Sequence, residues 1–167
     1  EADLVTSNWR PIALYSGTLT GLDMKYHSVE SPGTDFILPE PKRLEGGVQK
    51  NLHSVMDDTI GMGKQMLVFV SSRSSAQKEA RELSSHLKTR LENGDLGFTE
   101  SVVESWTSMS QELWRGEDGS ATVKALSNSV RGGVGFHHAG LTSSQRKVIE
   151  NGFRNGNLQC IVATPTL

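Results

Sequence analysis

The stretch that decides the fold is Val134–Leu167, which reads VGFHHAGLTSSQRKVIENGFRNGNLQCIVATPTL. Its apolar pattern predicts a strand over Val134–His138, a helix over about Ser143–Asn155, and a second strand over Leu158–Ala163. Each strand runs into a loop of small and hydroxyl-bearing residues, and the first of these loops opens the helix. In parallel sheets, strand ends of this kind are where phosphates and nucleotides bind.

Capping signals support these boundaries. Thr142 with Gln145 fits a capping box, in which the hydroxyl accepts a free backbone amide and the longer side chain reaches back. Gly156 stands where a left-handed helix stop is expected. Upstream, Ser74 with Gln77 predicts a second capping box for an earlier helix.

The upstream elements give the fold class. Gln65–Val70 is a continuous apolar run, which predicts a strand buried on both faces. A helical repeat of apolar residues follows and stops at Gly94, another helical face covers 102–113, and Ser120 can cap a further helix. Strands that alternate with helices predict an α/β domain with a parallel sheet and right-handed crossovers.

The N-terminal part has a different character. Residues 8–30 are rich in β-formers, with a turn at Thr20-Gly21, and residues 31–47 carry the prolines and glycines of a linker. We therefore expect an extended arm and linker over 1–47 and an α/β domain over 48–167.

Composition sets further limits. At 167 residues and 35% hydrophobic content, one domain with a modest core is expected. The longest apolar run, Met66–Val70, is too short to cross a membrane, and Glu1-Ala2-Asp3 does not begin a signal peptide. The single cysteine, Cys160, suits a reducing compartment and a structural role, so a cytoplasmic or nucleoid-associated location is expected.

The net charge of −2 gives no global support for nucleic-acid binding, but the charge is uneven. Seven acidic residues and one basic residue lie between Glu92 and Asp118, whereas Arg131–Arg154 holds four basic residues and one acidic residue. Ordinary solvated faces explain such a pattern; so does an electropositive edge that faces phosphates.

Three strand ends are rich in groups that bind phosphate. Ser71-Ser72-Arg73 follows the first strand, a Ser- and Thr-rich loop with Arg146 follows the second, and Thr164 follows the third. In a parallel sheet these ends share one edge, so two helix N-termini would converge there. Several such groups in a row suit a polymer of phosphates, although Ser and Thr that merely cap helices, with a solvated Arg146, remain an alternative.

Other motifs are rejected. Gly61–Gln65 lacks the spacing and the hydroxyl of a phosphate loop and precedes its strand. His137 and His138 are neighbours in a strand and point to opposite faces, so no metal site is expected. No nucleophile elbow anchors a hydrolytic triad. The tryptophans are expected to pack rather than to stack on bases.

The sequence resembles the superfamily-two DExH-type helicases. It is most similar to the branch with the archaeal DNA-repair helicases, the helicase part of DNA polymerase theta, and the Ski-two-like RNA helicases. The resemblance covers nearly the whole chain and is most specific in GFHHAGL at 135–141, in FRNG at 153–156 and in VATPTL at 162–167. Trp9-Arg10-Pro11 resembles the family's crossing between its two motor domains.

The resemblance implies the second RecA-like domain of an ATP-driven translocase, truncated within motif V, whose motifs IV, IVa and V grip a single-strand backbone. The residues that it carries over as nucleic-acid contacts are Ser71, Ser72, Arg73, Gly140, Gln145, Arg146 and Thr164. Gly140 is expected to permit a tight turn that brings amides to a phosphate. Such contacts position a strand without reading its sequence.

The family's catalytic motifs are missing from these residues. The phosphate loop, the DExH motif and the arginine finger of motif VI are absent, so no catalytic residue is expected here and the chain alone is expected to be inactive. ATP and Mg²⁺ are expected in the parent protein, bound mainly by the first RecA-like domain, which would be a partner of this one. The sheet is expected to be incomplete at its C-terminal end.

The expected ligand is single-stranded or forked nucleic acid, DNA rather than RNA, with no membrane partner. An RNA motor of the same superfamily is the alternative, because backbone contacts alone do not separate the two. A non-enzymatic Rossmann-like binding or interaction module is a second alternative. A dinucleotide-binding domain is disfavoured because no Gly-x-Gly-x-x-Gly follows a strand.

Overall fold

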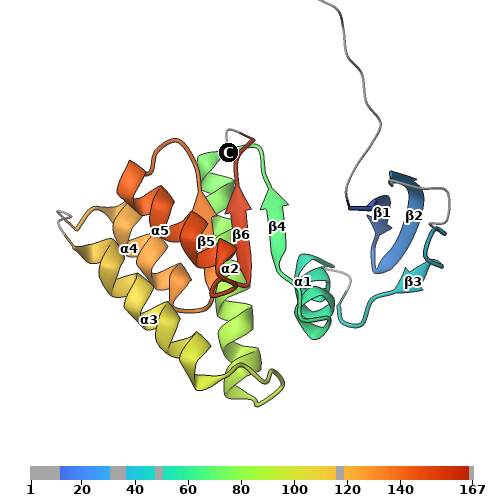
Figure 1. Ribbon diagram of the computed structural model, residues 1–167, viewed down its shortest axis with the longest axis horizontal. Helices are drawn as coiled ribbons and strands as arrows, with labels where there is room; N and C mark the ends of the chain where they lie inside the picture. The colour runs from blue at the N-terminus through green and yellow to red at the C-terminus, as the bar shows by residue number, and fades with distance from the viewer. Residues whose placement is uncertain (1–11, 31–36, 48–50, 116–118, 166–167) are drawn as a thin grey trace, which may run out of the picture. The chain divides into compact units, whose positions relative to one another are not determined.

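A computed structural model describes residues 12–30, 37–47, 51–115 and 119–165 (Figure 1). Trp9-Arg10-Pro11, at the expected crossing between motor domains, lies outside the described residues, as do Thr166 and Leu167 of the motif V stretch. The chain divides into two compact units between Val55 and Met56, within helix α1 (Asn51–Gly61). Each unit is described by itself.

The first unit contains a small antiparallel sheet. Its strands are β1 (Leu14–Thr20), β2 (Asp23–Glu30) and β3 (Lys42–Arg43), in the order β1-β2-β3. The predicted turn at Thr20-Gly21 is confirmed, and Gly21 adopts the positive φ of 62° that such a turn favours. The strand β3 lies in the segment 31–47 whose composition indicated a linker; it is short and pairs with β2 through two residues.

The second unit is built on a parallel sheet of three strands. These are β4 (Met66–Phe69), β5 (Val134–His137) and β6 (Cys160–Ala163), in the order β4-β6-β5. Both β4 and β5 pair in register with Cys160–Ala163. The predicted α/β architecture, with a parallel RecA-like sheet flanked by helices, is confirmed.

The prediction that the strand within Gln65–Val70 is buried on both faces is wrong. Within the described residues β4 has a single partner strand, β6, and so stands at an edge of the sheet. Leu67 and Phe69 keep 43% and 56% of their surface exposed, whereas every residue of β5 and β6 is buried. The continuous apolar run marked a strand correctly but did not show which strands lie beside it.

Among the described residues of the second unit, the helices that follow β4 pack on the sheet or on one another. They are α2 (Arg73–Glu92), α3 (Glu100–Trp114), α4 (Ala121–Val130) and α5 (Ser143–Arg154). Helix α2 packs on β5, β6 and α4, while α5 packs on β5, β6 and α3 (Figure 1). The helix α3 contacts both α4 and α5, and its predicted apolar face is confirmed by the burial of Trp106, Met109 and Leu113.

The helix ends agree with most of the capping predictions. The box formed by Thr142 and Gln145 is present at α5, and Ser120 caps α4. Gly156 adopts the predicted left-handed conformation with φ of 78°, and Gly94, the predicted stop, has φ of 75°. The capping box predicted at Ser74 is wrong, as shown below.

Two further findings concern composition. Burial raises the pKa of the Cys160 thiol to about 12, which fits the expected structural role. In the part of the chain that the structure describes, no helix combines the length and the apolar character needed to span a membrane.

Candidate nucleic-acid interface

The carboxyl ends of the three parallel strands meet at one edge of the sheet. The Val70 amide donates to the Ala163 carbonyl at 2.8 Å, and the Thr164 amide donates to the His137 carbonyl at 3.1 Å. These bonds continue the ladder one step beyond the strands themselves. The loops that begin at Ser71, His138 and Thr164 therefore start side by side, as expected for strand ends that share one edge of a parallel sheet.

Helix α2 begins at this edge with Ser72 as its N-cap. The Ser72 hydroxyl accepts the Ser75 amide at 3.1 Å, so Ser74 lies inside the first turn and does not cap the helix. Gln77, the other member of the predicted box, instead contacts His138. The first amides of α2, on Arg73 and Ser74, are helix N–H groups that have no intrahelical acceptor.

Of the predicted site residues on this loop, Ser71 and Arg73 are exposed at the edge, whereas Ser72 is half-buried. The Ser72 hydroxyl is occupied as a cap and also lies within 3.0 Å of the hydroxyls of Ser74 and Ser75. The chemistry left for an anion is therefore the Ser71 hydroxyl, the Arg73 guanidinium and the first amides of α2.

His138 links this helix start to the loop after β5. Its ring is 2% exposed and stacks on Phe136 at 5.3 Å between centroids. Nδ1 accepts the Gly140 amide at 3.1 Å, and Nε2 lies 3.2 Å from the side-chain nitrogen of Gln77. Burial, and next the positive charge of Arg73, lower the pKa of the His138 imidazole, so the neutral ring is favoured.

The backbone at Gly140 passes close to two side chains of this edge. Its φ is not in the left-handed region; instead, a Cβ there would lie 3.1 Å from the His138 ring and 3.4 Å from Nη1 of Arg73. Its amide is bound to His138, and the Leu141 amide donates to the His138 carbonyl. These amides are therefore engaged within the loop, where the His138 imidazole and the Arg73 guanidinium approach the backbone closely.

Helix α5 begins at the same edge. The Gln145 side chain is 5% exposed, and its Oε1 accepts the Thr142 amide at 3.0 Å, so Gln145 acts as a capping residue. Arg146 is half-buried and donates to the Ser143 hydroxyl at 3.3 Å. The amides of Ser143 and Ser144, in the first turn, have no intrahelical acceptor.

Thr164 follows β6 and is buried, and its amide is engaged with the His137 carbonyl. Its position at the strand end agrees with the sequence analysis. Its low exposure distinguishes it from Ser71 and Arg73, which face solvent.

His137 points to the opposite face of the sheet from His138, as the alternation of side chains along a strand requires. Its Nε2 lies 2.9 Å from Oε1 of Glu150 on α5. Across the described residues, no group of three or more His, Cys, Asp or Glu side chains is arranged to hold a metal ion. The two histidines thus tie β5 to helices on both faces.

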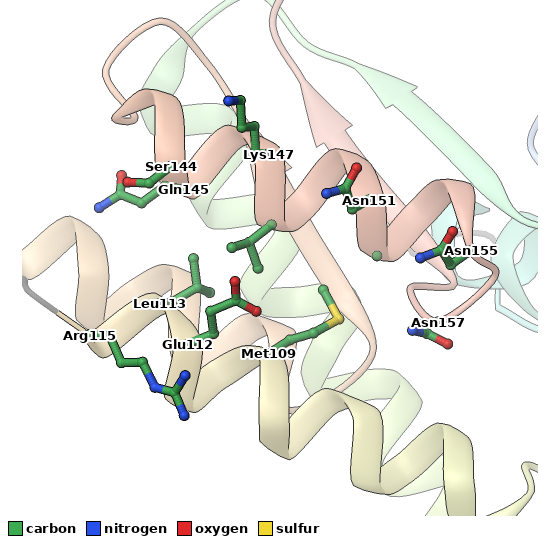
Figure 2. A pocket seen from close by; sticks show the side chains of 12 residues that line it. Met109, Glu112, Leu113, Arg115, Ser144, Gln145, Lys147, Asn151, Asn155 and Asn157 are labelled. Carbon is green, nitrogen blue, oxygen red and sulfur yellow. The ribbon is translucent and has the colours of Figure 1, made fainter.

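A hollow of about 600 Å³ lies between α3 and α5 (Figure 2). Figure 2 shows Lys147 and Asn151 of α5 on one side, with Met109, Glu112 and Leu113 of α3 on the other. Its lining mixes a carboxylate with cations, amides and apolar side chains, which gives no consistent preference for an anion.

No protein-family model matches the chain. Over 170 aligned residues the whole chain is 36% identical to the ATP-dependent DNA helicase Hel308 of Thermococcus kodakarensis and spans 13% of that protein. It is 34% identical to the Hel308 of Caldivirga maquilingensis and 29% identical to that of Methanocella arvoryzae, and spans 20% of each. The chain therefore covers about a fifth, or less, of the length of these relatives.

Proposed function

The chain belongs to the superfamily-two DExH-type helicases, and we propose that it holds the phosphate backbone of a single DNA strand within an ATP-dependent helicase. The observation that carries this proposal is the alignment of the three strand ends through the Val70–Ala163 and Thr164–His137 hydrogen bonds. That alignment brings two helix starts and two arginines to one edge. The relatives are named DNA helicases, which favours DNA over RNA as the strand.

The contacts that we propose are of two kinds. The first amides of α2 and α5 carry the partial positive charge of a helix start and suit phosphate oxygens. The guanidinium groups of Arg73 and Arg146 add full charges with planar donors. Ser71 contributes an exposed hydroxyl. We retain Ser72, Gly140, Gln145 and Thr164 in the site, with Ser72, Gly140 and Gln145 acting by shaping the loops.

This arrangement reads no bases, because donors at strand ends and helix starts face the backbone. Binding should therefore be similar on unrelated sequences and should weaken steeply with salt. A forked or single-stranded substrate would supply such a backbone. A protein that acts on DNA would work in the cytoplasm or at the nucleoid, which agrees with the buried, unpaired thiol of Cys160.

ATP hydrolysis is proposed for the whole protein, with ATP and Mg²⁺ bound chiefly by a first RecA-like domain that closes against this one. The 167 residues contain no Gly-x4-Gly-Lys-Ser/Thr sequence and no DExH sequence. We therefore expect the isolated chain to show no DNA-stimulated ATP turnover. A phosphate-release assay that detected sustained turnover by the purified chain would overturn this part of the proposal.

The grip is tested in the intact protein with the double variant Arg73→Gln/Arg146→Gln. The matched control is Lys64→Gln/Arg154→Gln, which removes the same charge from exposed positions away from the edge. Fluorescence anisotropy with single-stranded DNA is measured between about 50 and 200 mM salt. For single strands, the slope of log affinity against log salt should fall by about 1.4 in the double variant and stay unchanged in the control.

If the slope of log affinity against log salt is the same in the two variants, the proposed contacts of Arg73 and Arg146 with the phosphate backbone are refuted. A loss that depended strongly on base sequence would point to base readout instead. Replacing the DNA by an RNA strand of the same sequence tests the alternative, since preference for RNA requires contacts to the 2′-hydroxyl.

A further inference from the structure

A second cationic surface lies between α2 and α4, away from the hollow of Figure 2. This groove has a volume of about 460 Å³. Lys78, Arg81 and Lys88 of α2 line it, together with serine and amide side chains of α2 and α4. The side chains that line it include three cations and no carboxylate.

The floor of the groove is fixed by serines of both helices. The Ser84 hydroxyl donates to the Ser129 carbonyl at 2.9 Å, and the Ser129 hydroxyl donates to the Ala80 carbonyl at 3.1 Å. These reciprocal bonds are buried and hold α2 against α4. The groove is therefore formed in advance, which lowers the ordering cost of binding a ligand.

The three cations lie along one face of α2. Successive offsets of three and seven residues keep Lys78, Arg81 and Lys88 on the same side of a helix. From Ser74 to Lys88 the helix rises by about 21 Å at 1.5 Å per residue. That length spans several phosphates of one strand, so a polyanion that continues from the edge fits better than a single nucleotide.

The chemistry of the lining favours a phosphate backbone over a protein surface. Ala125 is the sole apolar side chain among the residues that line the groove, and the others are cations, hydroxyls and amides. Protein interfaces depend on aromatic and other apolar side chains at their centre, which this lining lacks. Cations with hydroxyl and amide donors are the usual contacts to phosphate oxygens.

One end of the groove opens at the strand edge. Ser74 and Gln77 line it, Ser74 touches the N-cap Ser72, and Gln77 contacts His138, the ring that binds Gly140. The groove and the edge therefore share the first turn of α2. A nucleic-acid strand held at the edge could therefore continue directly into the groove.

We propose that the groove between α2 and α4 is a second binding site for the phosphate backbone, and that it extends the path of the strand held at the edge. The inference rests on the proposed function, because that function places the strand at the edge from which the path enters the groove. The cations of the groove are distinct from Arg73 and Arg146, so each site can be removed while the other stays intact.

The test uses the intact protein and fluorescent oligothymidylates of about 6 and about 20 nucleotides, of which the longer exceeds the usual single-strand site size of about 4–16 nucleotides. The groove variant is Lys78→Gln/Arg81→Gln, the edge variant is Arg73→Gln/Arg146→Gln, and the control is Lys64→Gln/Arg154→Gln. All three remove two positive charges by the same type of substitution. Lys78, Arg81, Lys64 and Arg154 are exposed, so these changes should leave the fold intact, which circular dichroism checks.

The groove variant should lower the salt slope on the longer strand by about 1.4 relative to the control and leave the short strand unaffected. The edge variant should weaken binding to both lengths. If the groove variant matches the control on both lengths, the inference is wrong while the proposed grip stands. If the groove variant weakens both lengths equally, the groove does not extend the path and the inference is again wrong.

The remaining outcomes separate the two proposals further. If the edge variant matches the control while the groove variant weakens the long strand, the groove survives as a binding site and the proposed grip fails. If the unmodified protein binds neither oligonucleotide, both are refuted.

Discussion

Gly133 provides the sharpest test of how the second unit packs. It precedes β5 with φ of 75°, and a Cβ built there would lie 2.6 Å and 2.9 Å from two atoms of the Trp106 ring and 3.0 Å from Leu87. The Trp106 ring is buried, and its Nε1 donates to the Asn157 carbonyl at 2.6 Å. The ring therefore cannot move aside without losing that bond or displacing its neighbours.

The expected cost of Gly133→Ala has two parts. The left-handed conformation costs an L-residue about 1–2 kcal/mol, and overpacking of a filled core costs about 1–3 kcal/mol more. Gly156→Ala is the matched control, because Gly156 has φ of 78° but nothing within 4 Å of its Cβ position. Both changes restrict the unfolded chain alike, so their difference isolates the collision with Trp106.

Urea unfolding of the two variants, followed by far-ultraviolet circular dichroism, should give a free energy of unfolding about 1–3 kcal/mol lower for Gly133→Ala than for Gly156→Ala. The corresponding difference in Tm is about 2–12 °C for a chain of this size. Equal losses in the two variants would show that the Trp106 ring yields freely, and the packing argument would then be wrong.

Three further predictions concern two residues beside the carboxyl ends of the strands and one residue of the outer strand β4. Because the folded state lowers the pKa of His138, the unfolded state binds more protons on acidification, so stability should fall as the pH drops below about 6.5. His138→Asn keeps an acceptor for the Gly140 amide and should reduce that decline in urea unfolding at several pH values. Thr142→Ala removes the cap shared with Gln145 and should cost about 1 kcal/mol in the same measurement, with no loss expected if the cap is dispensable. Phe69→Ser, at an exposed position of β4, should change stability by less than about 1 kcal/mol, and a loss typical of a buried aromatic would contradict its exposure.

Local signals in the sequence predicted much of this fold correctly. The box at Thr142 and the glycine stops at Gly94 and Gly156 depend on residues a few positions apart, and each appears as expected. The strand ends also follow from local pattern together with one topological rule, that parallel strands share their carboxyl edge. That combination sufficed to bring the three loops together.

Nonlocal features were beyond this type of reasoning. The apolar run of β4 looks the same whether the strand is central or at an edge, since neighbouring strands come from distant parts of the chain. Four serines flank Arg73, and the choice of Ser72 over Ser74 as the cap depends on where β4 ends. The surroundings of Gly140 depend on the His138 ring and on the Arg73 guanidinium, which comes from a distant part of the chain.

The consecutive histidines of the β5 end explain why the two helix starts are held at one edge. His138 reaches Gln77 of α2 on one face, and His137 reaches Glu150 of α5 on the other. Side chains of consecutive residues leave a strand on opposite faces, so one strand end fastens both layers of helices. A backbone grip needs its donors at fixed spacing, because phosphates along a strand are themselves evenly spaced. The histidine pair fastens α2 and α5 to the same strand end, which is the fixed spacing that the proposed grip requires.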